Sequence, residues 1–199
     1  SFENIKNFYD QNLHPDKIDL NNQEVYKHIF DKGKWVGIFQ FTEGGAQTFA
    51  QQVKPKSIID LAAITSIYRP GPLSAGVDRD YVDASNDPIN IKYLHPIVEE
   101  VTSETYGFLI FQEQIAMLAY RLGDGITMDE ANLLRKILTK KGTGKGHEVK
   151  DTLYDKFVKG CIIKGIKEHE ARKLWQTFEY FSGYGFNKSH AVSYSVISY

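Results

Sequence analysis

The sequence predicts a mainly α protein that contains at most a few short strands. Over most of the chain, apolar residues recur every three or four positions, which is the spacing of one face of a helix. N-cap residues, prolines and glycines bracket these stretches as helix start and stop signals. Only two short apolar runs have the composition of strands, so we expect no extended sheet.

The first predicted elements are two helices with a strand between them. The first helix covers 23–32, because Asn22 is a suitable N-cap and Gly33 occupies the stop position. The run 34–41 is rich in aromatic and β-branched side chains, which favours a short strand. A more polar helix follows over 45–53.

The next predicted element is a strongly apolar helix over 58–68. Ser57 and Asp60 stand at its start with the spacing of a capping box. The Pro-Gly-Pro sequence after Arg69 ends it, because proline lacks a backbone donor and restricts the residue before it. Residues 73–93 are predicted to be rich in loops.

Helices are also predicted over most of the remaining chain. A second strand candidate, 108–111, interrupts them, and Thr127 and Glu130 have capping-box spacing. The predicted helices cover 96–103, 112–122, 128–140, 147–164 and 167–182, and a last one begins near Lys188.

Length and composition indicate an ordinary globular protein. The 199 residues suffice for one or two domains, and 42% are hydrophobic and 25% charged. A net charge of -1 excludes an overall basic field, so nucleic acid would have to bind a local patch. No apolar run reaches the roughly 20 residues of a membrane helix. The one cysteine, Cys161, lies in an apolar helical stretch, which favours a buried structural thiol and a reducing compartment.

The segment 183–191 is the most informative in the chain. Two glycines permit a tight turn, and Asn187, Lys188, Ser189 and His190 follow in consecutive positions. These side chains offer donors to oxygen and a fixed cation, so a loop-to-helix junction of this kind can hold an anion or a polar ligand. The alternative is a helix cap, in which Asn187 is the N-cap and the other three residues are solvated.

A second candidate segment, 133–145, contains cations and no acid. Its cations are Arg135, Lys136, Lys140, Lys141 and Lys145. Arginine pairs bidentately with phosphate oxygens, which favours phosphate binding. Cations at a helix C-terminus also stabilise the helix, and this alternative accounts for Lys140 and Lys141 better than for Arg135.

The glycines around Lys145 do not form a nucleotide-binding P-loop. Gly146 follows the lysine at the position where that template needs Ser or Thr. A basic loop of this kind remains compatible with contacts to a nucleic-acid backbone, and we expect Lys145 and Lys150 to make them.

Asp78, Asp80 and Asp83 form a carboxylate cluster that could bind Mg²⁺ for phosphoryl transfer. The alternative is a solvated acidic loop that caps helices. The six histidines show no zinc-ligand spacing with one another or with Cys161. Glu113 is expected to be a hydrogen-bonded structural residue.

Taken together, these segments resemble the C family of DNA polymerases, that of the bacterial replicative DNA polymerase III alpha subunit. The matching motifs, in order, are Gly37-Ile38-Phe39-Gln40-Phe41, Tyr68-Arg69-Pro70-Gly71-Pro72, Glu104-Thr105-Tyr106-Gly107, Phe111-Gln112-Glu113-Gln114, Leu133-Leu134-Arg135-Lys136 and Gly183 through Ala191. The resemblance covers about residues 20–199. The chain differs from the family pattern at 139–142 and in the basic loop 142–150.

The resemblance implies that residues 21–199 are an irregular helical fingers domain that continues beyond Tyr199. Residues 1–20 would be a helix or linker leading from a palm domain. The chain starts at Ser1, without Met, and ends inside a helical pattern, which also suggests a piece of a longer protein.

The resemblance also implies which residues meet the ligands. The expected nucleotide-binding residues are Arg135, Lys136, Lys140, Lys141, Asn187, Lys188, Ser189, His190 and Arg69, the last as a basic contact or as a brace for the Pro-Gly-Pro turn. The family's catalytic carboxylates and the Mg²⁺ that they bind belong to the palm. We therefore expect no catalytic or metal-binding residue in this chain, and no polymerisation by the chain alone.

The intact protein is expected to be a cytoplasmic DNA-directed DNA polymerase, a nucleotidyltransferase that acts in DNA replication. Its partners would be primer–template DNA and deoxynucleoside triphosphates. A sliding clamp and other replisome subunits would bind regions outside this chain, and no membrane is expected. Two alternatives stay open: a non-catalytic nucleic-acid-binding module of a related protein, and a Mg²⁺-dependent phosphohydrolase that uses Asp78, Asp80 and Asp83.

Overall fold

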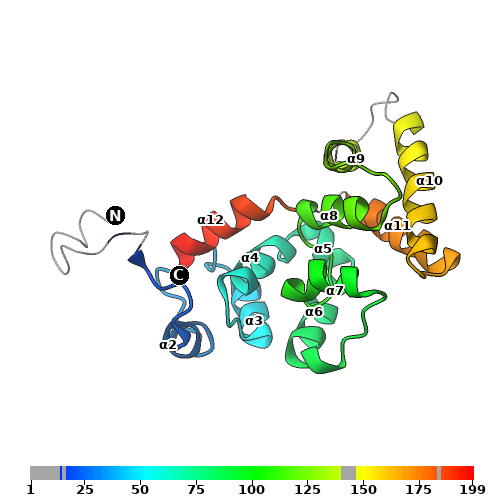
Figure 1. The fold of residues 1–199 in the computed structure, drawn as a ribbon. Coiled ribbons are helices and arrows are strands. Elements are labelled where there is room, and N and C mark those ends of the chain that lie inside the picture. Colours follow the sequence, from blue (N-terminus) through cyan, green and yellow to red (C-terminus); the bar gives the residue numbers. More distant parts are fainter. Residues whose placement is uncertain (1–13, 15–16, 140–146, 183–184) are drawn as a thin grey trace.

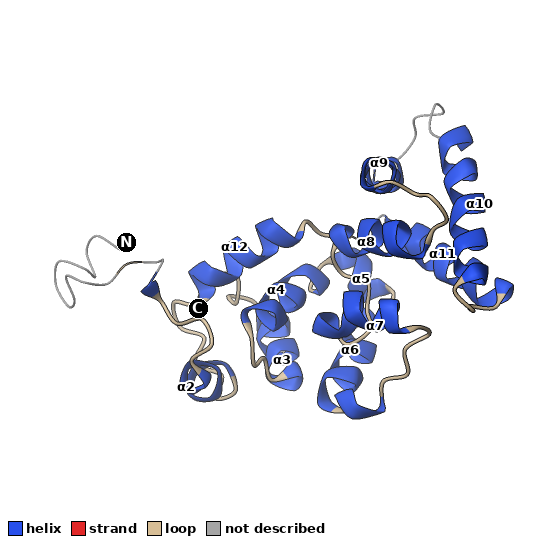
Figure 2. Ribbon diagram, in the orientation of Figure 1, coloured by secondary structure: helices blue, strands red, loops and turns tan. Residues whose placement is uncertain are grey.

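The computed structural model describes residues 14, 17–139, 147–182 and 185–199. These residues form an elongated array of helices (Figure 1), and no strand is drawn among them (Figure 2). The closest approach to a sheet in this part of the chain is an isolated parallel bridge between Phe111 and Phe186. The mainly α class is therefore confirmed. The expected N-terminal helix or linker, 1–20, lies almost entirely outside the described residues.

The helices predicted before residue 70 are present. Their bounds are α2 (Gln23–Val25), which continues into the π-helical turn η2 (Tyr26–Phe30), then α3 (Gly44–Val53) and α4 (Ile58–Ile67). Both expected N-caps are confirmed, since the Asn22 side chain accepts from the Glu24 N–H and the Ser57 side chain from the Asp60 N–H.

The predicted strand 34–41 is wrong. Gly37 and Gln40 have φ angles of 81° and 69°, so the backbone folds back in successive turns instead of extending. The rings of Trp35 and Phe41 stack with centroids 5.3 Å apart. Phe41 is buried, and Trp35 and Ile38 pack against the α4 core, while Val36 and Phe39 are exposed, so the folded turn needs no partner strand.

The predicted loop 73–93 is also largely wrong. It contains the end of α5 (Pro70–Ser74), then α6 (Val77–Asn86) and the 3₁₀ turn η3 (Pro88–Asn90). In α6, Val77, Tyr81 and Ser85 are buried at four-residue spacing, while acidic residues lie in its first turn, where the helix dipole favours them. The many aspartates resemble a loop in composition, but the buried face holds the segment in a helix.

The remaining helices agree closely with the predicted ranges. They are α7 (Pro96–Thr102), continued by the 3₁₀ turn η4 (Ser103–Thr105), then α8 (Gln112–Leu122), α9 (Met128–Thr139), α10 (His147–Ile163), α11 (Glu168–Ser182) and α12 (Lys188–Ser198). The capping box is confirmed: Thr127 N donates to Glu130 Oε2 at 2.8 Å, and Glu130 N donates to Thr127 Oγ1 at 3.2 Å.

Two hydrophobic cores support these helices. The α4 core lies between α2, η2, α3, α4, α6 and α12, and α12 runs along α4 (Figure 1). The α8 core lies between α7, α8, α9, α10 and α11. Phe181 on α11 packs against both cores, and Phe111 belongs to the α4 core although it immediately precedes α8. The start of α8 therefore lies at the junction of the two cores.

Cys161 lies in the α8 core and is fully buried, as expected. Burial raises the pKa of its thiol to about 11, so the thiol is protonated at neutral pH. None of the helices in the described part of the chain is long and apolar enough to cross a membrane.

Candidate functional site

The candidate site is built on the junction of the two cores. Phe186 N donates to Ile110 O at 3.0 Å, and Gln112 N donates to Phe186 O at 2.9 Å. These two backbone hydrogen bonds hold the entrance of α12 against the entrance of α8. The beginning of the fourth matching motif therefore lies directly against the last one, although many residues separate them in the sequence.

Asn187 is the N-cap of α12, so this part of the alternative is confirmed, whereas Lys188 is not solvated as expected but paired with Glu104. Its Oδ1 accepts from His190 N at 2.9 Å and from Ser189 Oγ at 2.7 Å. On the other side, the carboxylate of Glu113 accepts from Asn187 Nδ2 and from Lys188 N, both at 3.0 Å. Glu113 is thus hydrogen-bonded, as expected, and it places a negative charge at the positive end of the α12 dipole.

The side chains at the start of α12 point to different neighbours. Lys188 Nζ lies 2.6 Å from Glu104 Oε1, in an ion pair that leaves about a third of each side chain exposed. His190 is exposed, and its ring lies 4.2 Å from the Tyr194 ring and 5.5 Å from the Phe186 ring, measured between centroids. Ser189 is also exposed. Lys188 is therefore engaged within the chain, whereas Ser189 and His190 face solvent.

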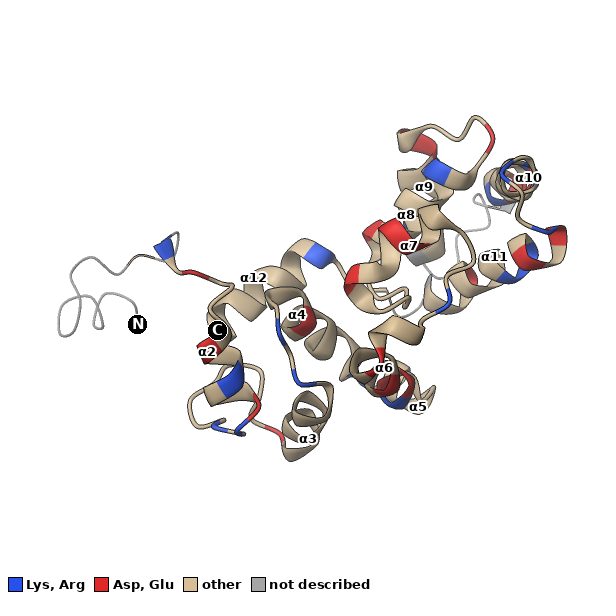
Figure 3. Cartoon of the chain, turned by 60° about the horizontal axis from the view of Figure 1, so that its bottom comes forward, with Lys and Arg blue, Asp and Glu red and all other residues tan. Residues whose placement is uncertain are grey.

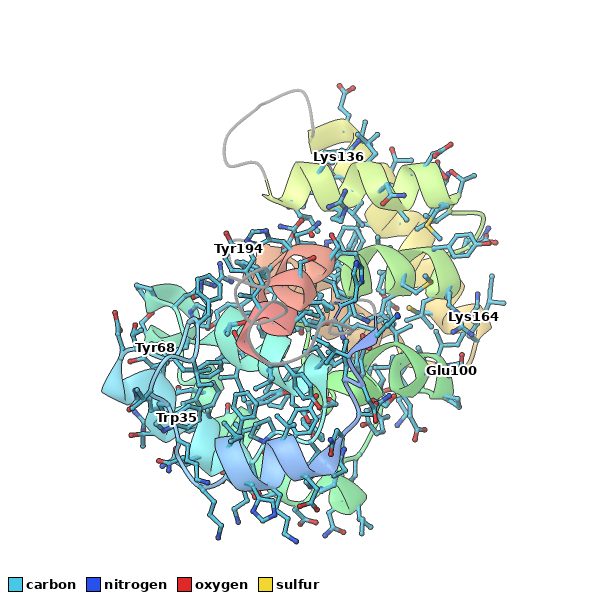
Figure 4. All side chains as sticks on the ribbon, turned by 90° about the vertical axis from the view of Figure 1, so that its left-hand side faces the viewer. Trp35, Tyr68, Glu100, Lys136, Lys164 and Tyr194 are labelled. Atoms are coloured by element: carbon cyan, nitrogen blue, oxygen red, sulfur yellow. The ribbon has the colours of Figure 1, made fainter. Side chains whose placement is uncertain are left out.

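Arg135 reaches the same junction from α9. Its Nη1 donates to Gln112 Oε1 at 3.1 Å, and Gln112 Nε2 donates to Gly185 O at 2.9 Å. One glutamine side chain thus connects the two candidate segments, 133–145 and 183–191. Lys136, the next residue on α9, is exposed near the upper end of the molecule in Figure 4.

Arg69 joins the junction from the end of α4. Its guanidinium carbon lies 4.7 Å from the centroid of the Phe186 ring, in a cation–π contact, and its Nε donates to Ser66 O at 2.7 Å. Burial lowers the pKa of this guanidinium, which nevertheless stays charged because arginine titrates so far above neutral pH. Arg69 therefore braces the turn after α4 against Phe186.

Two adjoining cavities open beside Arg69. The larger one has a volume of about 600 Å³ and the smaller one about 220 Å³, and they share the lining residues Gln40, Thr65, Tyr68 and Arg69. Phe186, His190 and Tyr194 complete the wall of the smaller cavity. Tyr68 and Tyr194 lie on the same side of the view in Figure 4, opposite Glu100 and Lys164. A volume of this size suits a small-molecule ligand.

Gln40 and Gln112 belong to matching motifs, although the sequence alone predicted no role for either. The positive φ of Gln40, 69°, is uncommon for a residue with a side chain, and such backbone often occurs at functional sites. Gln112 is the first residue of a helix directly after an apolar run. The signal that could have revealed it is a polar side chain directly after the apolar run 108–111. Such a side chain is expected to point away from the core that the run enters.

One further predicted ligand-binding residue is described, and three are not. Lys150 on α10 pairs with Glu179 Oε1 at 2.6 Å, so it faces α11. Lys140, Lys141 and Lys145 lie outside the described residues.

The acidic cluster does not form a metal site. Figure 3 shows acidic residues along α6 and α7, and Asp78, Asp80 and Asp83 belong to α6. Within the described parts of the chain, no group of three or more His, Cys, Asp or Glu side chains could hold a metal ion. This geometry does not favour the phosphohydrolase alternative.

Comparisons with known proteins identify the family of the chain. Residues 1–162 match the family model described as the bacterial DNA polymerase III alpha subunit finger domain. The chain is 37% identical over 183 residues to the DNA polymerase III subunit alpha of Aquifex aeolicus, covering 92% of this chain and 15% of that protein. For the same subunit of Halalkalibacterium halodurans the identity is 34% over 195 residues, covering 98% and 17%.

A further relative is the DNA polymerase III subunit alpha of Rickettsia conorii, which is 38% identical over 188 residues, or 92% of this chain and 15% of that protein. The chain thus spans about a sixth of the length of these relatives, since it aligns with 15 to 17% of each. The match to the family model extends from residue 1 into α10, and the matches to the relatives extend over almost the whole chain. The chain belongs to the family of bacterial DNA polymerase III alpha subunit finger domains.

Proposed function

We propose that this chain binds the incoming deoxynucleoside triphosphate and the primer–template end in a template-directed replicative DNA polymerase. Two findings support this function. The first is the family to which the chain belongs. The second, which carries most of the argument, is the hydrogen-bonded connection from Arg135 through Gln112 to Gly185, because it joins two donor-rich segments that are distant in sequence.

Under this proposal, Arg135 and Lys136 contact the triphosphate, and Lys140 and Lys141 add positive charge nearby. Arginine suits this role because its planar group pairs bidentately with phosphate oxygens. Asn187 holds the start of α12 in place, so that Ser189 and His190 line the nucleotide site. Lys188 would have to exchange Glu104 for a phosphate before it could bind nucleotide.

Arg69, Lys145 and Lys150 complete the proposed contacts. Arg69 adds a cation beside the cavities that it lines. Lys145 and Lys150 would contact the DNA backbone, where each basic contact releases a counterion and makes binding depend on salt. Because Lys150 is paired with Glu179, we expect its contribution to be the smallest of these.

The chemical contribution of this chain is positioning and electrostatic stabilisation of the transferring phosphoryl group. The catalytic carboxylates and the Mg²⁺ that they bind would come from the palm, elsewhere in the intact polymerase. The proposed partners are accordingly DNA and deoxynucleoside triphosphates here, and a sliding clamp and other replisome subunits through other regions. The proposed location is the cytoplasm.

The test is Arg135→Ala in the intact polymerase subunit that contains this chain. We expect a loss of about 100-fold in kcat/KM for single-nucleotide incorporation, because a preorganised cation is removed from the phosphates. Arg172→Ala is the matched control, since Arg172 pairs with Glu168 on the surface of α11, and it should leave kcat/KM unchanged. Unchanged kcat/KM in Arg135→Ala would refute the proposed role.

A second measurement separates the proposal from the non-catalytic alternative. A nucleic-acid-binding module without a nucleotide site would bind DNA with a steep salt dependence, and added nucleotide would not alter that binding. A nucleotide-binding fingers module predicts tighter binding of primer–template DNA when the matching deoxynucleoside triphosphate is present.

A further inference from the structure

Gln112 has an unusual set of partners for a half-buried glutamine. Its side-chain oxygen accepts from Arg135 Nη1 at 3.1 Å, and its side-chain nitrogen donates to Gly185 O at 2.9 Å. Its backbone N–H donates to Phe186 O at 2.9 Å. One residue therefore contacts α9 on one side and the loop before α12 on the other.

The chemistry of these partners fixes the orientation of the amide. A guanidinium group has only donors, and a backbone carbonyl has only an acceptor. If the amide were turned over, its NH₂ group would face the guanidinium and its oxygen would face the carbonyl. Both contacts would then be lost at once, so the two partners define a single orientation.

Gly185 allows the close approach that this connection requires. A Cβ atom built on Gly185 would lie 3.0 Å from Gln112 Cγ, which is tighter than an ordinary van der Waals contact. Gly185 N also donates to Phe181 O at 2.6 Å, at the end of α11. The backbone at Gly185 is thus held by α11 on one side and by Gln112 on the other.

Gln114, two residues further along α8, provides a contrast within the same helix. It is 4% exposed, its Oε1 accepts from Ile110 N and Phe111 N, and its Nε2 donates to Val101 O and Thr105 Oγ1. Gln114 therefore satisfies buried groups that lead into α8, and its hydrogen bonds within the described residues reach neither candidate segment. Its role is structural, whereas the partners of Gln112 lie in the proposed site.

We propose that Gln112 is a positioning residue for nucleotide incorporation. It holds the guanidinium of Arg135 at a fixed place relative to the Gly185 carbonyl, and thus relative to the residues that follow it at the start of α12. The phosphate oxygens of the nucleotide would then find the Arg135 guanidinium and the donors at the start of α12 already in position. These groups would not have to move during the reaction. This inference rests on the proposed function, because it requires Arg135 to act on the nucleotide.

A double-mutant cycle in the intact polymerase subunit tests it, with Gln112→Met, Arg135→Ala and the double variant. We expect Gln112→Met to lower kcat/KM for single-nucleotide incorporation about 10-fold, because a misplaced group loses much of its effect. In the Arg135→Ala background, the same substitution should have almost no further effect, since its target is absent. The loss should appear in the nucleotide kinetics, with the Kd for DNA unchanged.

Two controls separate positioning from general damage, and a third variant repeats the test. Gln176→Met places the same substitution on the exposed face of α11 and should change nothing. Gln114→Met should lower the thermal unfolding midpoint, and its effect on kcat/KM should be independent of Arg135. Gln112→Glu keeps an acceptor for Arg135 but places a carboxylate against Gly185 O, and it provides a second, near-isosteric variant for the same cycle.

Two results would overturn the positioning role while leaving the proposed function intact. One is an additive loss in kcat/KM from the Gln112 and Arg135 substitutions. The other is an unaltered kcat/KM in Gln112→Met and Gln112→Glu. If Arg135→Ala itself had no effect, both proposals would fall, and the Arg135→Ala measurement alone would show it. A loss that is absent in the Arg135→Ala background supports the proposal.

Discussion

The α4 core and the α8 core bury different kinds of side chains. The α4 core is built around large aromatic rings and includes the buried carboxylate of Asp60, which accepts from Tyr106 Oη at 3.0 Å and from Lys56 N at 2.8 Å. The α8 core is mostly aliphatic, and its charged groups form partly exposed pairs around it, such as Lys156 with Glu130 at 2.6 Å. The first core thus encloses a carboxylate with its donors, and the second brings backbone segments into close contact at Gly160.

The candidate site lies where the two cores meet. Arg69 at the end of α4 and Phe186 and His190 at the entrance of α12 line the smaller cavity. The Gln112 amide at the junction is held by elements of both cores. Phe111 belongs to the α4 core, and the next residue, Gln112, contacts Arg135 on α9 of the other core. Three substitutions and one change of pH test the difference between the two cores, from the largest expected effect to the smallest.

Gly160→Val should disrupt the α8 core most. A Cβ at this position would lie 2.2 Å from Leu122 O and 2.3 Å from Asp124 N, and these backbone atoms cannot move aside like a flexible side chain. We expect a loss of roughly 3 kcal/mol or more in the free energy of unfolding, measured by urea denaturation of the chain. Gly44→Ala in α3 is the matched control, because its Cβ would meet nothing within 4 Å. A stable Gly160→Val variant would contradict the close packing.

Asp60→Ala should disrupt the α4 core to a smaller extent. It leaves the half-buried Tyr106 hydroxyl and the Lys56 N–H without their acceptor, which costs about 2 kcal/mol in unfolding free energy. Asp60→Asn is the control, because its amide can keep one bond and reverse the other. If both variants lost equal stability, the charge of Asp60 rather than its hydrogen bonds would be the important property.

Alkaline pH should weaken the α8 core through Cys161. Burial raises the pKa of its thiol from 9.0 to about 11, so the folded state holds its proton more tightly than the unfolded state does. The associated stability is complete below pH 9 and is lost as the pH rises toward 11, by about 1 kcal/mol at pH 10. Urea denaturation between pH 8 and 10 measures it, and Cys161→Ala should show a correspondingly smaller slope. An identical slope in that variant would assign the loss to other groups.

Tyr81→Phe should have the smallest effect, and one of opposite sign. Among the buried side-chain polar atoms of the described residues, the Tyr81 hydroxyl oxygen is the one without a hydrogen-bond partner. Its removal should increase the free energy of unfolding by about 0.5–1 kcal/mol, because the cost of burying it disappears while the ring remains. Tyr106→Phe, which removes a hydroxyl that donates to Asp60, should instead destabilise the chain. Destabilisation by Tyr81→Phe would indicate a bound water at that hydroxyl.

The helices could be predicted well because their signals are local. Ser57, Thr127 and Asn187 act as caps as their spacing predicted, since a cap forms with N–H groups two or three residues away. The strand 34–41 and the loop 73–93 could not be predicted in the same way. The apolar residues of 34–41 have the composition of a strand, and the aspartates of 73–93 have the composition of a loop. Contacts with the α4 core decide the conformation of both segments.

The candidate site stays a prediction. Arg69, Arg135 and His190 contact residues of the junction, and their contacts with ligands are untested. Lys188 and Lys150 are engaged in ion pairs with Glu104 and Glu179, which no spacing could reveal because each partner belongs to a distant helix or turn.

The sequence by itself determined the mainly α class, the ends of most helices and the family, since capping groups, prolines and motif order can be read along the chain. The tertiary structure alone decided which motifs meet. It brings Gln112 between Arg135 and Gly185, because the burial of the two cores fixes the backbone of α8 against the entrance of α12. The energy of that burial depends on contacts between segments distant in sequence.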